Sequence, residues 1–75
     1  MKKVTIYTKS NCSACLSAKS FLHSQNVDFK EIHIDNNPEA MKVLIADQAI
    51  TVPYIKIGKE KIIGFNTKSI LNALK

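Results

Sequence analysis

Segments typical of strands and segments typical of helices alternate along this chain, and that order limits the folds open to it. β-branched and aromatic residues at 4–8 predict a strand. Apolar residues at spacings of three and four then predict a helix over 13–25. A second strand is expected over 29–34, and Asn37-Pro38 marks the N-cap and first position of a second helix. Such alternation is typical of an α/β domain.

The C-terminal part of the chain predicts a hairpin and a last helix. Short strands over 54–57 and 61–63 flank Gly58-Lys59, which indicates antiparallel pairing. Asn66 or Thr67 can cap the helix that follows. The order β-α-β-α-β-β-α, with its parallel crossover at the start, predicts a four-stranded mixed sheet flanked by helices on both faces. The length allows a single domain over residues 1–75.

Helical spacing also predicts which side chains face the core. The expected core positions of the three helices are Ala14, Ala18, Phe21, Leu22, Met41, Leu44, Ile45, Ile70, Leu71 and Leu74. Ile32 and Ile34 share one face of the second strand, while His23 and His33 are expected at the surface.

The net charge of +5 comes from lysines alone, because the chain has no arginine. The lysines are scattered, so we expect a solvated basic surface that attracts acidic partners. Arginine is the side chain that usually recognises guanine, and its absence leads us to expect no nucleic-acid site. No apolar run approaches the roughly 18 residues of a membrane span, and no signal-peptide pattern is present. We therefore expect a cytoplasmic monomer with no membrane partner.

Both cysteines lie in Cys12-Ser13-Ala14-Cys15, between the first predicted strand and the first predicted helix. This spacing at this junction indicates a redox pair. Cys12 stands at the helix start, where unpaired N–H groups and the helix dipole favour the reactive thiolate. Lys9 adds a positive charge three residues earlier.

Cys15 falls one turn further in, on the apolar side of the helix. We therefore expect Cys12 to attack a substrate disulfide and Cys15 to resolve the mixed disulfide. Ser13 and Ala14 are small and leave the sulfur accessible, and the Ser13 hydroxyl can offer it a hydrogen bond. The pattern predicts a thiol–disulfide oxidoreductase with no tightly bound cofactor and no metal.

Other uses of the cysteines remain open at this point. A structural disulfide is unusual in the cytoplasm and would close a very short loop. Zinc needs four ligands, and His23 and His33 complete no known finger spacing. An iron–sulfur carrier or metal-binding module, with Cys12 thiolates of two chains and an external thiol around a cluster, is the alternative function.

Thr51-Val52-Pro53 stands before the third predicted strand. The residues alone favour an ordinary trans proline at a strand entrance. The sharper interpretation is a cis proline that turns the Val52 backbone toward the cysteines, where it can pair with an extended substrate segment.

Gly64-Phe65-Asn66 lies between the last strand and the last helix. Gly64 permits a close turn, and the helix N-terminus that follows is a ready site for a carboxylate. A turn followed by a helix cap is the simpler interpretation.

Taken together, these motifs resemble the glutaredoxin family, including the glutaredoxin-like redoxins that serve ribonucleotide reductase. The resemblance rests on 7–9 before the cysteines, the cysteine motif, 51–53 and the Gly64-Phe65 turn. It implies a thioredoxin fold with a cis Pro53, with Cys12 as nucleophile and Cys15 as resolving thiol. It also implies a groove for glutathione as co-substrate, to which Lys9, Thr51 and Val52 contribute.

The chain departs from the family pattern in two places. Ser13-Ala14 replaces the usual Pro-Tyr, and Asn66-Thr67 stands where two aspartates would hold the amino group of glutathione. Glutathione and a thioredoxin reductase are therefore both open as electron donor. The implied substrates are disulfide-containing proteins, ribonucleotide reductase among them, or glutathione mixed disulfides, in a role in electron transport and cell redox homeostasis.

Overall fold

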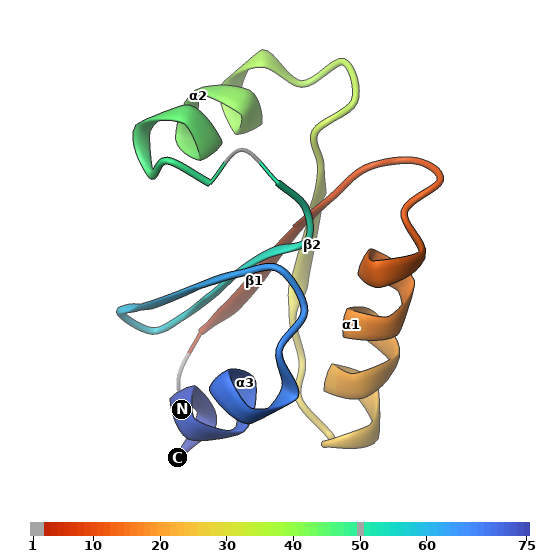
Figure 1. The fold of residues 1–75 in the computed structure, drawn as a ribbon, viewed down its shortest axis with the longest axis vertical. Helices are drawn as coiled ribbons and strands as arrows, with labels where there is room; N and C mark the ends of the chain where they lie inside the picture. The colour runs from red at the N-terminus through yellow and green to blue at the C-terminus, as the bar shows by residue number, and fades with distance from the viewer. Residues whose placement is uncertain (1–2, 50) are drawn as a thin grey trace.

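A computed structural model describes residues 3–49 and 51–75, which form a sheet with helices on both faces (Figure 1). Residues 1, 2 and 50 of the expected domain lie outside these ranges. The predicted element order and α/β class are confirmed. In chain order, the elements are β1 (Val4–Thr8), α1 (Ser13–Ser24), β2 (Lys30–His33), α2 (Pro38–Ala46), β3 (Tyr54–Ile57), β4 (Glu60–Ile63) and α3 (Thr67–Leu74).

The four strands lie in the order β2-β1-β3-β4. β1 and β2 are parallel, whereas β3 is antiparallel to both β1 and β4. At the end of β1, Tyr7 pairs with Ile32 and Thr8 pairs with His33. The sheet is therefore the predicted mixed one, and its register brings the end of β2 beside the chain that enters α1.

Two apolar clusters hold the helices to the sheet. α1 and α3 cover one face, and α2 covers the other, as the ribbon shows (Figure 1). The buried members of the larger cluster are Val4, Ile6, Ala18, Leu22, Ile55, Ile57, Ile62, Ile70 and Ala73. Under α2, the rings of Tyr7 and Tyr54 stack with centroids 5.5 Å apart, and Ile32 and Ile34 pack against this smaller cluster.

The predicted core face of α2 is partly wrong. Leu44 is buried as expected, but Met41 is 40% exposed and Ile45 is 63% exposed. Ala40 and Val43 pack in the cluster beside Leu44 instead. The helix is rotated so that its small Ala40 lies toward the tyrosine pair, which leaves the bulkier neighbours in water.

Two further core positions are corrected in the other helices. Ala14 is exposed, because the buried stripe of α1 runs through Cys15, Ala18 and Leu22. Leu71 is 41% exposed, and α3 buries Ala73 beside Ile70 instead. Ala14 is one residue before the buried Cys15, and Leu71 is two residues before the buried Ala73.

The predicted caps are confirmed. Asn37 Oδ1 accepts a hydrogen bond from the Ala40 N–H at 3.2 Å, and Pro38 follows it at the first helical position. Asn66 Oδ1 accepts from the Ser69 N–H at 3.1 Å. No helix within the described ranges is long and apolar enough to cross a membrane.

Candidate active site

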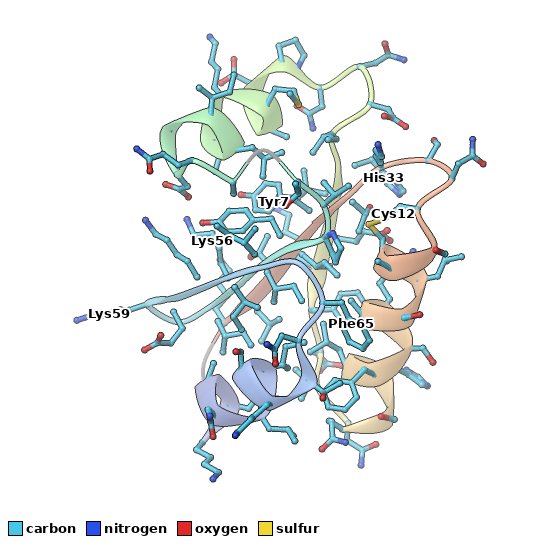
Figure 2. All side chains as sticks on the ribbon, viewed as in Figure 1. Tyr7, Cys12, His33, Lys56, Lys59 and Phe65 are labelled. Atoms are coloured by element: carbon cyan, nitrogen blue, oxygen red, sulfur yellow. A yellow bond between two sulfur atoms is a disulfide. The ribbon has the colours of Figure 1, made fainter. Side chains whose placement is uncertain are left out.

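The two cysteines lie at the N-terminus of α1 and are joined by a disulfide, with their Cα atoms 5.2 Å apart. Cys12 is the N-cap residue, and its Sγ accepts a hydrogen bond from the Cys15 N–H at 3.1 Å. Cys12 is partly exposed, whereas Cys15 is only 2% exposed. The two residues therefore differ in access, as the sequence predicts. Figure 2 shows Cys12 at the start of α1.

The loop before Cys12 is held in place from two sides. Asn11 has a positive φ of 57°, a conformation that asparagine tolerates better than most residues. The Ser10 N–H donates to Asp35 Oδ2 at 2.9 Å, which ties the loop to the chain after β2. The hydrogen bonds from Ser10 keep the pKa of Asp35 below its ordinary value. These contacts fix the direction from which Cys12 enters the helix.

One side of Cys12 opens into a cleft that we call the Val52 cleft. Its described lining residues are Lys9, Asn11, Cys12, Ser13, Ala14, Ile34, Thr51 and Val52. The structure thus brings together six site residues that the sequence singles out, from the two stretches 9–14 and 51–52. The cleft has room for a few residues of an extended peptide or a small thiol, with a volume of about 440 Å³.

The other predicted site residues are not among those that line this cleft. The Val52–Pro53 peptide bond is cis, as the family resemblance implies. The Pro53 carbonyl accepts from the Gly64 N–H at 2.8 Å, and Gly64 has a positive φ of 84°. The Phe65 ring turns toward α1 and meets the Phe21 ring edge-on at 6.1 Å (Figure 2). Since Asn66 caps α3, a substrate-binding role of Gly64, Phe65 and Asn66 stays a prediction.

The opposite side of the cysteine pair opens into a second cleft, the Glu31 cleft, which the sequence did not predict. It contains both Cys12 and the buried Cys15, together with polar side chains from α1 and β2. The lining residues are Thr8, Lys9, Ser10, Asn11, Cys12, Ser13, Cys15, Leu16, Lys19, Glu31 and His33.

A single carboxylate oxygen organises this second cleft. Glu31 Oε2 lies 2.8 Å from both the Thr8 Oγ1 and the Lys19 Nζ, and 3.5 Å from His33 Nε2. The hydrogen bond from Lys19 is the main reason that the pKa of Glu31 falls below its ordinary 4.5, and Thr8 adds to it. Thr8, which is 1% exposed, also lies 3.4 Å from His33 Nδ1.

A signal for this cluster is present in the sequence. Lys19 follows Cys15 by four residues and so shares its helix face. Glu31 and His33 alternate with Ile32 and Ile34 along β2, which places them on the other face of that strand. His33 is exposed as predicted, but its ring contacts show that it is more than an isolated surface residue.

Within 3–49 and 51–75, no three His, Cys, Asp or Glu side chains gather closely enough to hold a metal ion. The zinc site and the iron–sulfur carrier stay predictions.

The comparisons with known proteins converge on one family. The family model for glutaredoxin matches residues 4–62. Glutaredoxin 3 of Escherichia coli (strain K12) is 38% identical over 74 residues, which cover 97% of this chain and 89% of that protein. The glutaredoxin-like protein NrdH of the same strain is 31% identical over 68 residues, covering 91% of this chain and 84% of that protein.

Solved structures agree with the sequence comparisons. The NrdH-redoxin from Escherichia coli superposes with a TM-score of 0.88 at 30% identity, covering 97% of this chain and 95% of that one. Its structure is described as the basis for its thioredoxin-like activity profile.

Proposed function

Because the chain belongs to the glutaredoxin family and is a thiol–disulfide oxidoreductase with a thioredoxin fold, we propose that it reduces protein disulfides by a dithiol mechanism. The observation that carries this proposal is the asymmetry of the pair: Cys12 is partly exposed at the helix start, and Cys15 is 2% exposed behind it. An incoming disulfide can reach Cys12, while Cys15 is placed for an intramolecular second step.

The proposed reaction has two exchanges. The Cys12 thiolate attacks one sulfur of the substrate disulfide, forms a mixed disulfide, and releases the other sulfur as a thiolate. The Cys15 thiolate then attacks Cys12 Sγ, closes the Cys12–Cys15 disulfide, and releases the second substrate thiolate. Two electrons pass to the substrate, and the disulfide joining the two cysteines is the oxidised product.

The start of α1 favours Cys12 as the attacking thiolate. Its sulfur accepts the Cys15 N–H at 3.1 Å, and it sits at the positive end of the helix dipole. Lys9 borders both clefts beside Cys12. A negative sulfur is therefore stabilised here by a backbone donor, a dipole and a nearby cation.

We propose that the Val52 cleft receives the substrate. An extended segment on either side of the substrate disulfide would pair with the backbone of Thr51 and Val52 and place its sulfur against Cys12. The small side chains of Ser13 and Ala14 leave this approach open to a protein as well as to a small thiol.

A thioredoxin reductase is the electron donor that we propose, with glutathione as the alternative. The first turn of α3 has no acidic residue, and the Asn66 side chain is already engaged as its cap. The glutathione amino group would therefore lack the aspartates that the family pattern supplies. The thioredoxin-like activity profile ascribed to the Escherichia coli NrdH-redoxin agrees with this choice.

Ribonucleotide reductase is a candidate substrate, and the cytoplasm is the proposed location. The substrate and the location are both proposed from the resemblance to the redoxins that serve this enzyme. That resemblance lies in the Gly64-Phe65 turn and in the match to NrdH. A redoxin that is regenerated by reductases needs a compartment where thiols are kept reduced.

Substitution of each cysteine tests the dithiol mechanism. With Cys12→Ser, turnover of a protein disulfide should fall to the uncatalysed background, because no thiolate remains at the exposed position. With Cys15→Ser, the first exchange should still occur and the protein should accumulate as a mixed disulfide, visible by mass spectrometry of the intact protein. Retained turnover in Cys12→Ser would contradict the mechanism.

A side-by-side assay tests the donor. One arm supplies NADPH and thioredoxin reductase, and the other supplies NADPH, glutathione reductase and glutathione, each with the same protein disulfide. We expect faster NADPH oxidation in the first arm. A faster second arm would assign glutathione as the donor and would leave the two-cysteine mechanism unaffected.

A further inference from the structure

The resolving step needs a proton acceptor. Cys15 must become a thiolate to attack Cys12 Sγ, but it is 2% exposed and cannot release its proton freely into bulk water. Of the two clefts beside the pair, the Glu31 cleft is the one that Cys15 lines. The acceptor should therefore be found among the groups of that cleft.

Three kinds of titratable side chain line this cleft together with the cysteines. Lys9 and Lys19 carry ammonium groups, which ordinarily already hold their proton. Glu31 is a poor acceptor, because its Oε2 already accepts hydrogen bonds from Lys19 and Thr8 and because these bonds lower its pKa. His33 remains, and histidine is the side chain that exchanges a proton in the neutral range.

Both nitrogens of the His33 ring face polar groups of the Glu31 cleft. Nδ1 lies 3.4 Å from Thr8 Oγ1, whose own hydrogen is directed to Glu31. Nε2 lies 3.5 Å from Glu31 Oε2. The ring is therefore held against the cleft that Cys15 lines.

The charges around the ring are mixed. Glu31 on the same strand and Asp35 just beyond it are negative. Lys19 on α1 is positive and its ammonium group is bound to Glu31, and Lys9 on the loop before Cys12 is positive as well. The His33 side chain is 61% exposed, so a proton that reaches the ring can pass on to solvent.

We propose that His33 accepts the Cys15 proton during the resolving step, through the Glu31 cleft, and that Glu31 positions the ring. The Cys15 S–H bond breaks and the proton passes to a ring nitrogen. The Cys15 sulfur then attacks Cys12 Sγ, the bond from Cys12 to the substrate sulfur breaks, and the substrate leaves as a thiolate. The proton leaves His33 to water or to that thiolate. This inference rests on the proposed roles of Cys12 and Cys15.

The resolving step can be observed alone with dithiobis(nitrobenzoate), each half of which absorbs visible light when released. The reduced protein is mixed with less than one equivalent of this disulfide. Attack by Cys12 releases the first coloured thiolate in a second-order phase. Attack by Cys15 releases the second in a first-order phase, which is the rate of interest. Both are followed by stopped flow at several pH values.

The variant to test is His33→Gln, which retains a polar side chain but cannot take up a proton. At about pH 7 we expect the first-order phase to slow by at least about tenfold, with the second-order phase unchanged. The rate should then rise steadily with pH, as free hydroxide replaces the histidine. His23→Gln is the matched control, since His23 is exposed near the far end of α1. It should leave both phases unchanged.

Each other outcome has a defined meaning. A first-order phase with the wild-type rate and pH profile in His33→Gln would overturn the inference. An equal slowing of both phases would also overturn the inference, because it would mean that His33 affects the charge of the whole site rather than the Cys15 proton. A wild-type protein that releases no second thiolate would instead contradict the proposed two-cysteine mechanism.

Chemical rescue separates proton transfer from a structural role. In His33→Ala the exposed position leaves room for added imidazole. We expect imidazole to restore the first-order phase in proportion to its concentration, and to leave the second-order phase unchanged. No response to imidazole would count against proton transfer.

Discussion

At the residue scale, Glu31 is where the polar contacts beside the cysteines converge, and Lys19 is its strongest partner. In Lys19→Met we therefore expect the pKa of Glu31 to rise toward its ordinary 4.5, because the main hydrogen bond that lowers it is lost. An NMR titration of the Glu31 carboxyl carbon measures this. The control is Lys42→Met, whose ammonium is 3.8 Å from the exposed Glu39. An unchanged Glu31 titration in Lys19→Met would mean that the ion pair does not form in solution.

The same residues show how far the sequence predicts the site. Cys12 and Cys15 are adjacent in the chain, so a strand, a turn and a helix suffice to place them. Lys9 could be added as a nearby positive charge, whereas the residues alone favoured a trans Pro53, so that the family resemblance was needed to bring Thr51 and Val52 to the cysteines. The contacts among Lys19, Glu31 and His33 require that β2 pair with β1 in the register that sets Thr8 opposite His33. Periodicity groups Lys19 with Cys15 and Glu31 with His33, but it does not show that these two groups meet, because local patterns carry no information on the pairing of β2 with β1.

At the scale of elements, α2 depends on one large side chain. Leu44 is 2% exposed and belongs to the same cluster as the tyrosine pair, whereas its neighbour Ile45 is 63% exposed. Leu44→Ala should lower the free energy of unfolding by about 2–4 kcal/mol through lost burial and the cavity left behind. Ile45→Ala should change it by less than about 0.5 kcal/mol. Urea unfolding of both variants checks the phase of the helix, and the reverse order of effects would contradict it.

The phase of α2 illustrates what periodicity leaves undecided. Apolar residues occupy most positions of this helix, so that its pattern fits more than one buried face. These residues are Ala40, Met41, Val43, Leu44 and Ile45. The choice is made by the sheet, where two stacked rings take up the space and favour a small residue opposite them. The caps of the same helix were predictable, because a cap is a contact between near neighbours in the chain.

At the scale of the whole molecule, carboxylates with lowered pKa values connect separate parts of the fold. Glu31 joins β2 to α1, Asp35 joins the two loops beside the cysteines, and Asp47 joins the end of α2 to β3 and β4. The hydrogen bond from Tyr54, at 2.7 Å, is the main cause of the lowered pKa of Asp47. The ionised form of each group is therefore the form that the folded chain favours.

The direction of the acid response follows from these shifts. A carboxylate whose pKa is lower in the folded chain than in the unfolded chain adds stability that is present above its ordinary pKa, which is 3.8 for Asp and 4.5 for Glu. That stability is lost as the pH falls through the lowered value, because the unfolded chain then binds more protons. Protonation also raises the net charge above +5, which adds repulsion.

We therefore expect the free energy of unfolding in urea to decline as the pH falls below about 4. Asp47→Asn should be less stable than the wild type at neutral pH, since Tyr54, Lys56 and Lys61 lose their ionic partner. The difference should shrink in acid, where the wild-type carboxylate is protonated too. Asp28→Asn, at an exposed position, is the matched control and should follow the wild-type curve. A constant gap between Asp47→Asn and the wild type at all pH values would show that Asp47 acts through its shape rather than its charge.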